Sequence, residues 1–423
     1  MDKLTLKASG PLSGTIPIAG AKNSALKLMA AAILTDQEVV LNNLPNLADT
    51  RFMARLLDSL GIETYWPASS NTLRMRSAEL TSTIAPYDLV RKMRATFNVL
   101  GPLLARVGHA TVSVPGGCAI GARPVDLHLK AFEAMGAAIV IEEGYVKAAA
   151  LRGLHGADIT FPFPSVGATE HAMMGAVLAR GHTRLQNAAC EPEIADIANF
   201  LNSLGAKITG AGTSCIEIEG VSSLGGGEYA TMGDRIEAGT FMIAVAATGG
   251  DVTFAGANLG HLDALASALR DAGVAVEGVE GGVRVSRAGS GLKPVDIDTR
   301  PYPGFPTDLQ AQFMALMTIA DGVSTIRENI FENRFLHAPE LNRLGANISI
   351  RGSEAIVHGV GRLKGAPVMA TDLRASVSLV IAGLVAEGQT TINRVYHLDR
   401  GFENLEAKLN ACGAQIERSA DSD

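Results

Sequence analysis

The sequence lacks the features of a membrane protein, a disulfide-bonded secreted protein or a zinc domain. No apolar run approaches the roughly 20 residues that cross a bilayer, and the longest are segments such as 379–386. The N-terminus has no apolar signal-peptide core. The four cysteines are widely spaced and form no CxxC pair, which argues against a disulfide framework or a zinc site. We therefore expect a cytoplasmic protein with no membrane partner.

The sequence also has fewer basic than acidic residues. The chain has 36 Lys and Arg against 43 Asp and Glu, a net charge of −7, which argues against a nucleic-acid partner that needs an overall basic surface. There is no GxxxxGK[ST] or HExxH motif, and the glycines at 225–227 lack the GxGxxG arrangement. The nine histidines show no metal spacing, and we interpret His128 and His171 as helix residues. The sequence predicts no metal and no cofactor.

What the sequence does have is apolar residues and glycine. Apolar types make up 47% of the 423 residues, enough for a buried core and for two or three domains at roughly 150 residues each. Glycine accounts for 46 residues, a larger share than the usual figure of about 7%. This composition indicates a globular α/β protein with many tight turns.

A sixfold repeat accounts for many of these glycines. A leucine-rich helical stretch, a glycine and a short β-branched run recur at 68 to 75 residues (Gly205 to Gly273 is 68, Gly61 to Gly136 is 75). The glycines are Gly61, Gly136, Gly205, Gly273, Gly345 and Gly413. Each stands where a helix must stop, and a left-handed helix end costs glycine little. The β-branched residues that follow favour a strand.

A second marker, an apolar helix end followed by a strand, falls between these glycines. It contains Gly108, Gly181, Gly249, Gly322 and Gly388, with Thr35 and Asp36 in the sixth place. Each unit of about 70 residues therefore contains two helices, each followed by a strand. Six units could form one ring or two groups of three; the turn-rich stretch 220–233 favours a boundary after the third. Two lobes would leave a cleft, the usual place for a substrate.

Cations recur beside predicted helix starts, at Lys22, Arg123, Arg334 and Arg400. Asn23 or Ser24 would cap the first helix, and Pro124 suits a first helical position. Each cation alone could be a solvated surface residue. Together they predict a substrate with phosphate, carboxylate or both, because helix amides and cations bind anions jointly.

Two aspartates and one cysteine have candidate chemistry. Thr307 and Gln310 fit a capping box, so Asp308 is either a residue that complements the helix dipole or a base for proton abstraction. Asp372 has the same two interpretations, with Arg374 as a charge-assisted partner.

Cys118 lies in a glycine-bracketed loop beside Arg123. This setting indicates a reactive thiol that could donate a proton or act as a nucleophile, on a loop that could close over a ligand. Cys215 and Cys412 fit packing positions instead.

These motifs resemble the UDP-N-acetylglucosamine 1-carboxyvinyltransferases, a family of enolpyruvyl transferases. The matching segments are 18–23, 115–128, 305–308, 332–335, 370–376 and 399–401. The resemblance extends from Leu4 to Glu417, and the block around Cys118 is highly specific. It implies a two-lobed inverted α/β barrel built from six βαβαββ repeats, three per lobe. The N-terminal lobe would be 22–232, with the Cys118 loop, and the C-terminal lobe 1–21 and 233–423.

The family's reaction moves the enolpyruvyl group of phosphoenolpyruvate to the 3-hydroxyl of UDP-N-acetylglucosamine. It proceeds by addition and elimination through a tetrahedral ketal, releases phosphate and commits the sugar to peptidoglycan. By resemblance, Cys118 is the acid, which can also add to phosphoenolpyruvate, and Asp308 is the base. Lys22, Arg123 and Arg400 would hold the phosphoenolpyruvate anion. The implied sugar-nucleotide contacts are Asn23, Arg94, Arg123, Pro124, Val125, Asp126, Leu127, Ser165, Val166, Gly167, Asp308 and Ile330. Arg334, Asp372, Arg374 and Asp49 would support the cleft.

One position departs from the family pattern. Many relatives have a basic residue where this chain has Phe163, so we carry over the contacts of 165–167 with that difference in view.

Two alternatives stay open: a transferase acting on shikimate 3-phosphate, which lacks the Cys118 loop, and a non-catalytic nucleotide-sugar sensor. The oligomeric state does not follow from the sequence.

Overall fold

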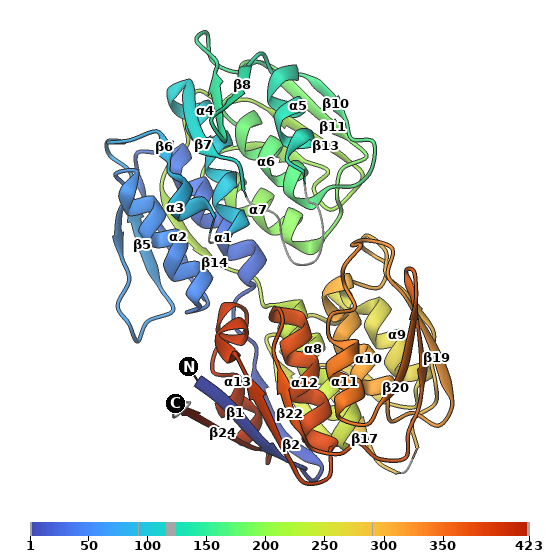
Figure 1. The fold of residues 1–423 in the computed structure, drawn as a ribbon. Coiled ribbons are helices and arrows are strands. Elements are labelled where there is room, and N and C mark those ends of the chain that lie inside the picture. The colour runs from blue at the N-terminus through green and yellow to red at the C-terminus, as the bar shows by residue number, and fades with distance from the viewer. Residues whose placement is uncertain (1, 92, 116–123, 290, 421–423) are drawn as a thin grey trace. The chain divides into compact units, whose positions relative to one another are not determined.

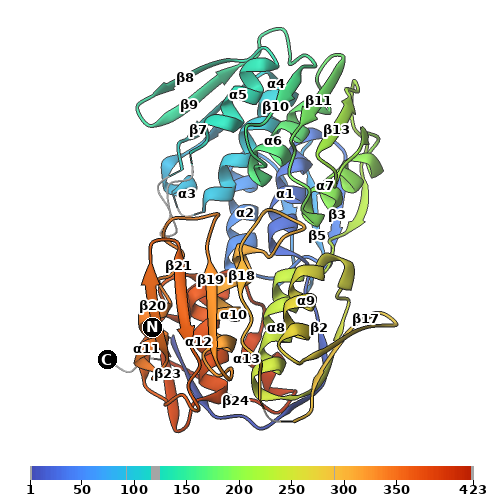
Figure 2. The ribbon, with the colours of Figure 1, turned by 90° about the vertical axis from the view of Figure 1, so that its right-hand side faces the viewer.

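Six four-stranded sheets with one shared pattern organise the protein. The structure, a computed structural model, describes residues 2–91, 93–115, 124–289 and 291–420. In every sheet of this part of the chain, a parallel pair of strands is followed by two antiparallel neighbours. Figure 2 shows one sheet in this order, β18 (Ile297–Asp298), β19 (Val323–Arg327), β21 (Glu354–His358) and β20 (Asn347–Arg351).

The chain divides into two compact units, each with three of the sheets. Of the described residues, unit 1 contains 2–19 and 233–420, and unit 2 contains 20–115 and 124–232. Unit 2 is thus a nearly continuous stretch of chain. Unit 1 is assembled from both ends of the chain.

Unit 2 contains three sheets and the helices between their strands (Figure 1). Its strands, in sheet order, are β14 (Gly227–Ala230), β3 (Glu38–Asn42), β5 (Leu73–Arg76) and β4 (Glu63–Tyr65); β6 (Ile84–Ala85), β7 (His109–Ser113), β9 (Tyr145–Ala149) and β8 (Ala138–Glu142); and β10 (Asp158–Thr160), β11 (His182–Gln186), β13 (Cys215–Glu219) and β12 (Lys207–Thr209). Its helices are α1 (Lys22–Ala31), η1 (Ala32–Leu34), α2 (Ala48–Ser59), α3 (Tyr87–Val90), η2 (Arg94–Val99), α4 (Leu100–Val107), α5 (Asp126–Ala134), α6 (Val166–Ala176) and α7 (Pro192–Ser203).

Unit 1 repeats the same scheme. Beside the sheet described above, its strands are β22 (Pro367–Met369), β23 (Gln389–Asn393), β1 (Asp2–Lys7) and β24 (Gln415–Ala420); and β16 (Ala275–Val279), β17 (Gly282–Arg287), β15 (Gly250–Ala255) and β2 (Leu12–Pro17). Its helices are α8 (Arg235–Thr248), η3 (Leu259–His261), α9 (Asp263–Asp271), η4 (Thr307–Leu309), α10 (Gln310–Met317), α11 (Ala338–Arg343), α12 (Leu373–Val385), η5 (Val395–Arg400) and α13 (Leu405–Asn410).

The helix-stop glycines have the conformation that the sequence predicts. The six glycines of the first marker have φ between +88° and +102°, the left-handed region that glycine adopts at little cost. In the sixth place of the second marker, Thr35 has an extended backbone with φ −128°. The prediction of left-handed helix ends is confirmed, and each such end leads the chain from a helix into a strand.

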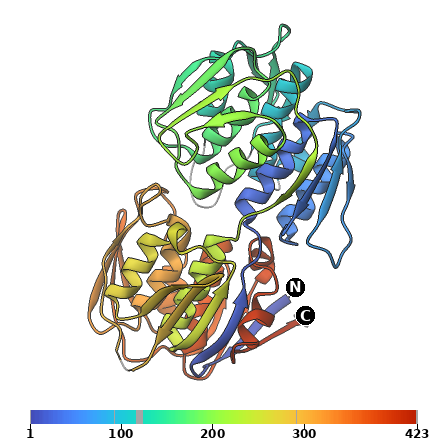
Figure 3. The same ribbon diagram turned by 180° about the vertical axis from the view of Figure 1, so that it is seen from behind.

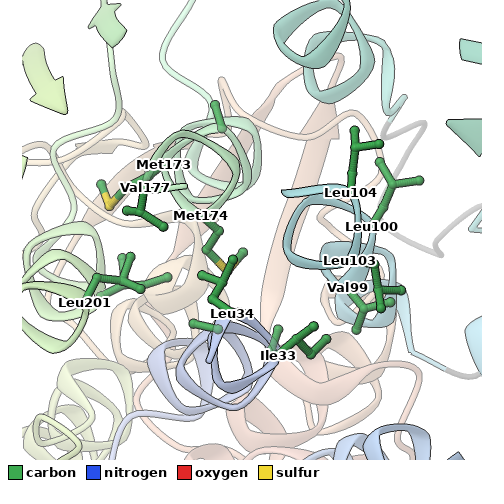
Figure 4. Close-up of a cluster of buried hydrophobic side chains, with 14 of the residues drawn as sticks. Ile33, Leu34, Val99, Leu100, Leu103, Leu104, Met173, Met174, Val177 and Leu201 are labelled. Carbon is green, nitrogen blue, oxygen red and sulfur yellow. The ribbon is translucent and has the colours of Figure 1, made fainter. Parts of the chain in front are cut away.

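Helices fill the centre of each unit. In unit 1, α8, α10 and α12 lie side by side (Figure 1), and most of their residues are buried on every face, as expected of central helices. In unit 2 the core lies between α1, α4, α6 and α7. Figure 4 shows Leu34 of η1, Met174 of α6 and Leu201 of α7 turned toward this core, and all three are buried.

The first strand pairs with the end of the chain. β1 lies antiparallel to β24 and β23, and β2 lies parallel to β15; Figure 3 shows β1 and β24 side by side. Within the predicted boundary stretch 220–233, residues 227–230 form a strand that pairs with β3. Cys412 is buried as predicted, but Cys215 is exposed, because Ile216 and Ile218 take the inward positions of β13.

Candidate active-site residues in the two units

Asp308 lies between two arginines in unit 1. Its Oδ1 accepts a hydrogen bond of 2.6 Å from Arg334 and its Oδ2 accepts one of 2.9 Å from Arg374. Both arginines are buried, with 5% and 8% of their side chains exposed, whereas 27% of the Asp308 side chain is exposed. Charge-assisted hydrogen bonds are stronger than neutral ones. The arrangement therefore fixes an accessible carboxylate by means of two buried cations.

Asp372 caps α12. Its Oδ1 accepts hydrogen bonds from the backbone amides of Arg374 (2.9 Å) and Ala375 (3.0 Å), so the carboxylate satisfies two of the unpaired donors of a helix start. The predicted side-chain pairing of Arg374 with Asp372 is wrong, because the guanidinium reaches Asp308 instead. Asp372 thus sets the start of the helix that brings Arg374 to Asp308.

Glu328 joins the segment 299–307, which precedes Asp308, to residues 330 and 331 by hydrogen bonds. The sequence analysis did not predict this role. This buried carboxylate accepts hydrogen bonds from Thr299 and Thr307, both 2.9 Å, and from the backbone amides of Ile330 (2.9 Å) and Phe331 (3.2 Å). The predicted capping box of Thr307 and Gln310 is wrong, because Pro306 is the N-cap of η4 and the Thr307 hydroxyl donates to Glu328. Ile330, a predicted sugar contact, is half-buried in the loop that Glu328 fixes.

Two histidines lie near these charges. Burial lowers the pKa of His337 to about 4, with Arg334 lowering it further and Asp372 opposing, so His337 is neutral at pH 7. Among the described residues, His337 Nε2 and Arg334 Nε are buried without a hydrogen-bond partner. The pKa of His397 is also lowered, by burial first and then by Arg400. Arg400 itself is the last residue of η5, not the start of the final helix as predicted, because α13 begins only at Leu405.

In unit 2, Lys22 is the first residue of α1. Its ammonium lies 3.4 Å from Asp49 in the first turn of α2, with 13% and 8% of the two side chains exposed. The predicted cap by Asn23 or Ser24 is wrong, because Ala21 is the N-cap and makes no side-chain cap hydrogen bond. Both residues are instead part of the helix itself, and Asn23 lies half-buried beside Lys22. The predicted cation at this helix start is confirmed.

The segment 124–127 leads into α5 later than predicted. Pro124 precedes the N-cap, Val125, so it is not the first helical residue, and the first turn begins with exposed Asp126. Val125 and Leu127 are buried. The guanidinium of Arg94 donates a 3.3 Å hydrogen bond to the carbonyl of Pro124, which ties the start of η2 to this segment.

Ser165 is the N-cap of α6 and the first residue of the predicted nucleotide-contact segment 165–167. Its side-chain oxygen accepts a 3.4 Å hydrogen bond from the amide of Ala168. Ser165, Val166 and Gly167 are half-buried, and the preceding Phe163 is 58% exposed. An exposed aromatic side chain thus lies two residues before the cap of α6.

The structure brings some predicted residues together and leaves others untested. Asp308, Arg334 and Arg374 form one cluster, and Lys22 and Asp49 form another. Cys118 and Arg123 lie outside the described residues, so their roles stay predictions. No sequence signal distinguishes Glu328 from the surface acids, because only its burial reveals its role.

The described ranges contain neither a metal-binding cluster nor a membrane-spanning helix. The histidine, cysteine and carboxylate side chains there form no group of three or more that would hold a metal ion. None of the helices there combines the length and the apolar character that crossing a bilayer requires.

Comparison with known proteins identifies the family. The model of the EPSP synthase (3-phosphoshikimate 1-carboxyvinyltransferase) family matches residues 6–409. Among solved structures, the enolpyruvyl transferase NikO from Streptomyces tendae is similar with a TM-score of 0.88 and 25% identity, covering 100% of this chain and 99% of that one. An EPSP synthase from Acinetobacter baumannii shares the fold, with a TM-score of 0.77 and 17% identity over 99% of this chain and 100% of that one. The chain therefore belongs to the enolpyruvyl transferase family and has its α/β fold.

Relatives with higher sequence identity indicate which group of enolpyruvyl transferases the chain belongs to. A protein of Hyphomonas neptunium named UDP-N-acetylglucosamine 1-carboxyvinyltransferase is 65% identical over 420 residues, 99% of each chain. Proteins of the same name from Maricaulis maris and Caulobacter vibrioides are 63% and 60% identical over 100% and 99% of this chain and 100% and 98% of their own. Full-length identity at this level places the chain among the UDP-N-acetylglucosamine 1-carboxyvinyltransferases.

Proposed function

We propose that the protein transfers the enolpyruvyl group of phosphoenolpyruvate to the 3-hydroxyl of UDP-N-acetylglucosamine, with release of phosphate, in the cytoplasm. The observation that carries this proposal is Asp308, a partly exposed carboxylate fixed by two buried arginines. The names of the full-length relatives supply the acceptor. The product would enter peptidoglycan synthesis, and phosphoenolpyruvate and UDP-N-acetylglucosamine are the partners.

Asp308 suits the role of base. Each carboxylate oxygen has two lone pairs, and the hydrogen bond from Arg334 or Arg374 uses one lone pair of its oxygen; in the proposed reaction Asp308 accepts the proton of the sugar hydroxyl. Two guanidinium partners restrict the carboxylate to one orientation, which lowers the entropic cost of placing it against the substrate. When the proton moves from the hydroxyl to Asp308, the sugar oxygen attacks the central carbon of phosphoenolpyruvate, and the methylene carbon takes a proton, which gives the tetrahedral ketal. The new methyl group then loses a proton as the C–O bond to phosphate breaks, which restores the double bond and releases phosphate.

The remaining roles follow the family resemblance. Cys118 would supply the proton to the methylene carbon, and Lys22, Arg123 and Arg400 would neutralise the phosphoenolpyruvate anion. Residues 124–127 and 165–167, with Asn23, Arg94 and Ile330, would contact the nucleotide sugar. The six sheets support an inverted α/β barrel of six βαβαββ repeats, with lobes 22–232 and 1–21 plus 233–423.

A phosphate-release assay with two acceptors tests the proposal. Purified protein is incubated with phosphoenolpyruvate and either UDP-N-acetylglucosamine or shikimate 3-phosphate. We expect phosphate only with the nucleotide sugar, and near-complete loss of turnover in Cys118→Ala. Phosphate release with shikimate 3-phosphate but not with UDP-N-acetylglucosamine would identify a transferase that acts on shikimate 3-phosphate. A rise in melting temperature with the nucleotide sugar, but no phosphate in a single turnover, would identify a sensor.

A further inference from the structure

Two buried histidines meet between α4, α5 and α6. His128 on α5 and His171 on α6 are 8% and 0% exposed, and their Nδ1 atoms lie 2.9 Å apart. The backbone amide of Gly101, in the first turn of α4, lies 2.7 Å from His171 Nε2. A peptide amide can only donate, so His171 Nε2 must be the acceptor and has no proton.

This single constraint determines both tautomers. A neutral His171 whose Nε2 accepts must hold its proton on Nδ1. That Nδ1–H donates to His128 Nδ1, and His128 therefore holds its own proton on Nε2. Protonation of His171 would place two donors against each other at Gly101. Consistently, the pKa of His171 lies well below its usual value, because of burial first, and the nearby Lys27 ammonium lowers it further.

The surrounding side chains hold both rings in place. Phe97 packs edge-on against His128 and His171, at 5.7 Å between ring centroids for each, and Phe132 packs against His171 at 4.8 Å. A Cβ at position 101 would lie 2.6 Å from His171 Cδ2, so only glycine fits beside the ring. The pair is therefore a rigid element, not two independent side chains.

The proton-bearing edge of His128 faces the start of α6. A Cβ at Gly167 would lie 3.1 Å from His128 Cε1 and 3.3 Å from its Nε2, so this edge packs directly against the first turn. That turn contains the predicted nucleotide contacts 165–167, and the nearby Phe163 brings no charge. A fixed N–H and the positive end of a helix dipole lie together at this point.

We propose that His171 is a positioning residue for nucleotide-sugar binding: it fixes His128 as the Nε2–H tautomer, which donates a hydrogen bond to an anionic group of the nucleotide sugar at the start of α6. This inference rests on the proposed function for its ligand. The tautomers can be tested without any ligand.

The first test is ¹⁵N nuclear magnetic resonance of the histidine rings in the full chain at pH 7.5, assigned with His128→Gln and His171→Asn. We expect Nδ1–H for His171 and Nε2–H for His128. An imidazolium ion, or the opposite tautomer at His128, would overturn the proposal whether or not the enzyme turns over.

The second test is kinetic and uses two matched variants. In His171→Gln the amide carbonyl can still accept from Gly101 but gives His128 no donor; in His171→Asn the amide nitrogen takes the place of Nδ1 and keeps that donor. We expect the KM for UDP-N-acetylglucosamine to rise roughly tenfold in His171→Gln. The kcat and the KM for phosphoenolpyruvate should stay within about twofold of the wild type. In His171→Asn the KM for UDP-N-acetylglucosamine should return most of the way to the wild-type value.

A double variant separates positioning from general packing. If His171 acts through His128, adding His171→Gln to His128→Ala changes KM no further. Melting temperatures show whether each variant is folded. Equal KM increases for Gln and Asn, or an additive double variant, would contradict the proposal; a wild-type enzyme that releases no phosphate would contradict the proposed function and leave the tautomer result standing.

Discussion

The two units share one sheet pattern but differ at the starts of their central helices. In unit 1, α8 and α12 begin with the aspartate caps Asp234 and Asp372, and η4, which leads into α10, has Asp308 in its first turn. In unit 2, α1 begins with Lys22 and η2 with Arg94, and α6 has the neutral cap Ser165. At the cap position, α8 and α12 thus have aspartates where α1, η2 and α6 have Ala21, Met93 and Ser165, and a cation follows the cap directly in both α1 and α8.

This difference separates what the fold requires from what the chemistry requires. A carboxylate cap satisfies the amides of a helix start and complements its dipole, so Asp234 and Asp372 serve stability. Lys22 is unfavourable beside the same dipole, by some tenths of a kcal/mol, and Asp49 lies 3.4 Å from its ammonium; the phosphoenolpyruvate anion is its second partner in the proposed function. Asp308 differs from the other two acids because arginine side chains, not helix amides, hold its carboxylate.

The largest expected effect comes from Asp308. Replacing it with Ala should lower kcat about 10²- to 10⁴-fold, the usual contribution of an acid–base group, while binding of UDP-N-acetylglucosamine stays measurable by calorimetry. Asp271→Asn, at an exposed position at the end of α9, is the control. Wild-type turnover in Asp308→Ala would mean that Asp308 is a structural residue like Asp234 and Asp372, and not the base.

Lys22 tests the cationic side of the comparison. Lys22→Ala should raise the KM for phosphoenolpyruvate at least roughly tenfold, because one charge-assisted contact is worth about 1.5–3 kcal/mol. It also leaves the buried Asp49 without this partner, so Lys22→Ala/Asp49→Asn is the matched variant. If the double variant recovers the wild-type KM, Lys22 only neutralises Asp49 and the ligand interpretation fails.

Glu328 tests how far the neighbouring loops support Asp308. Glu328→Ala leaves the two threonine hydroxyls and two amides without their acceptor, and should destabilise the protein by roughly 1–3 kcal/mol or more while lowering kcat. In Glu328→Gln the remaining oxygen keeps most of these hydrogen bonds, so denaturant unfolding and kcat should change less. Equal losses in both variants would mean that the negative charge matters more than the hydrogen bonds.

The last expected effect concerns folding alone and is a pH dependence of stability. Burial raises the pKa of Glu237 to about 7, against the lowering effects of Lys408 and the Ala19 amide. A folded-state pKa above the unfolded value of 4.5 means that the folded state binds the proton more tightly. The resulting stability is complete below about pH 4.5 and is lost as the pH rises toward 7.

Urea unfolding of the wild type and Glu237→Gln between pH 4.5 and 8 measures this contribution. The stability difference between the two proteins should shift by up to about 3 kcal/mol in favour of the glutamine variant as the pH rises. A difference that stays constant with pH would show that Lys408 keeps Glu237 charged throughout.

Sequence reasoning succeeded where one residue type determines the local conformation. The helix-stop glycines predicted the helix-to-strand units, because a left-handed helix end favours glycine. It failed on caps and partners: Ala21 caps its helix where Asn23 or Ser24 was expected, and Pro306 caps its helix where Thr307 was expected. Several residues in such a segment can cap a helix, and the choice depends on distant partners such as Glu328.

The candidate site was predictable as a set of residues but not as an arrangement. The motif around Asp308 identified the aspartate, yet its hydrogen bond to Arg374 joins residues 66 positions apart, and no periodicity encodes such a contact. The histidine pair had no signal at all, because His128 and His171 look like ordinary helix residues until the Nδ1 atoms are placed 2.9 Å apart.

The pairing of β1 with β24 has a consequence for synthesis on the ribosome. Residues 2–7 find their sheet partners only in 389–393 and 415–420, whereas unit 2 is a nearly continuous stretch that ends at 232. Domains generally fold as units while the chain emerges, N-terminal ones first. Unit 2 can therefore fold during translation, whereas β1 finds its sheet partners only after β23 and β24, which follow unit 2 in the chain, have been made.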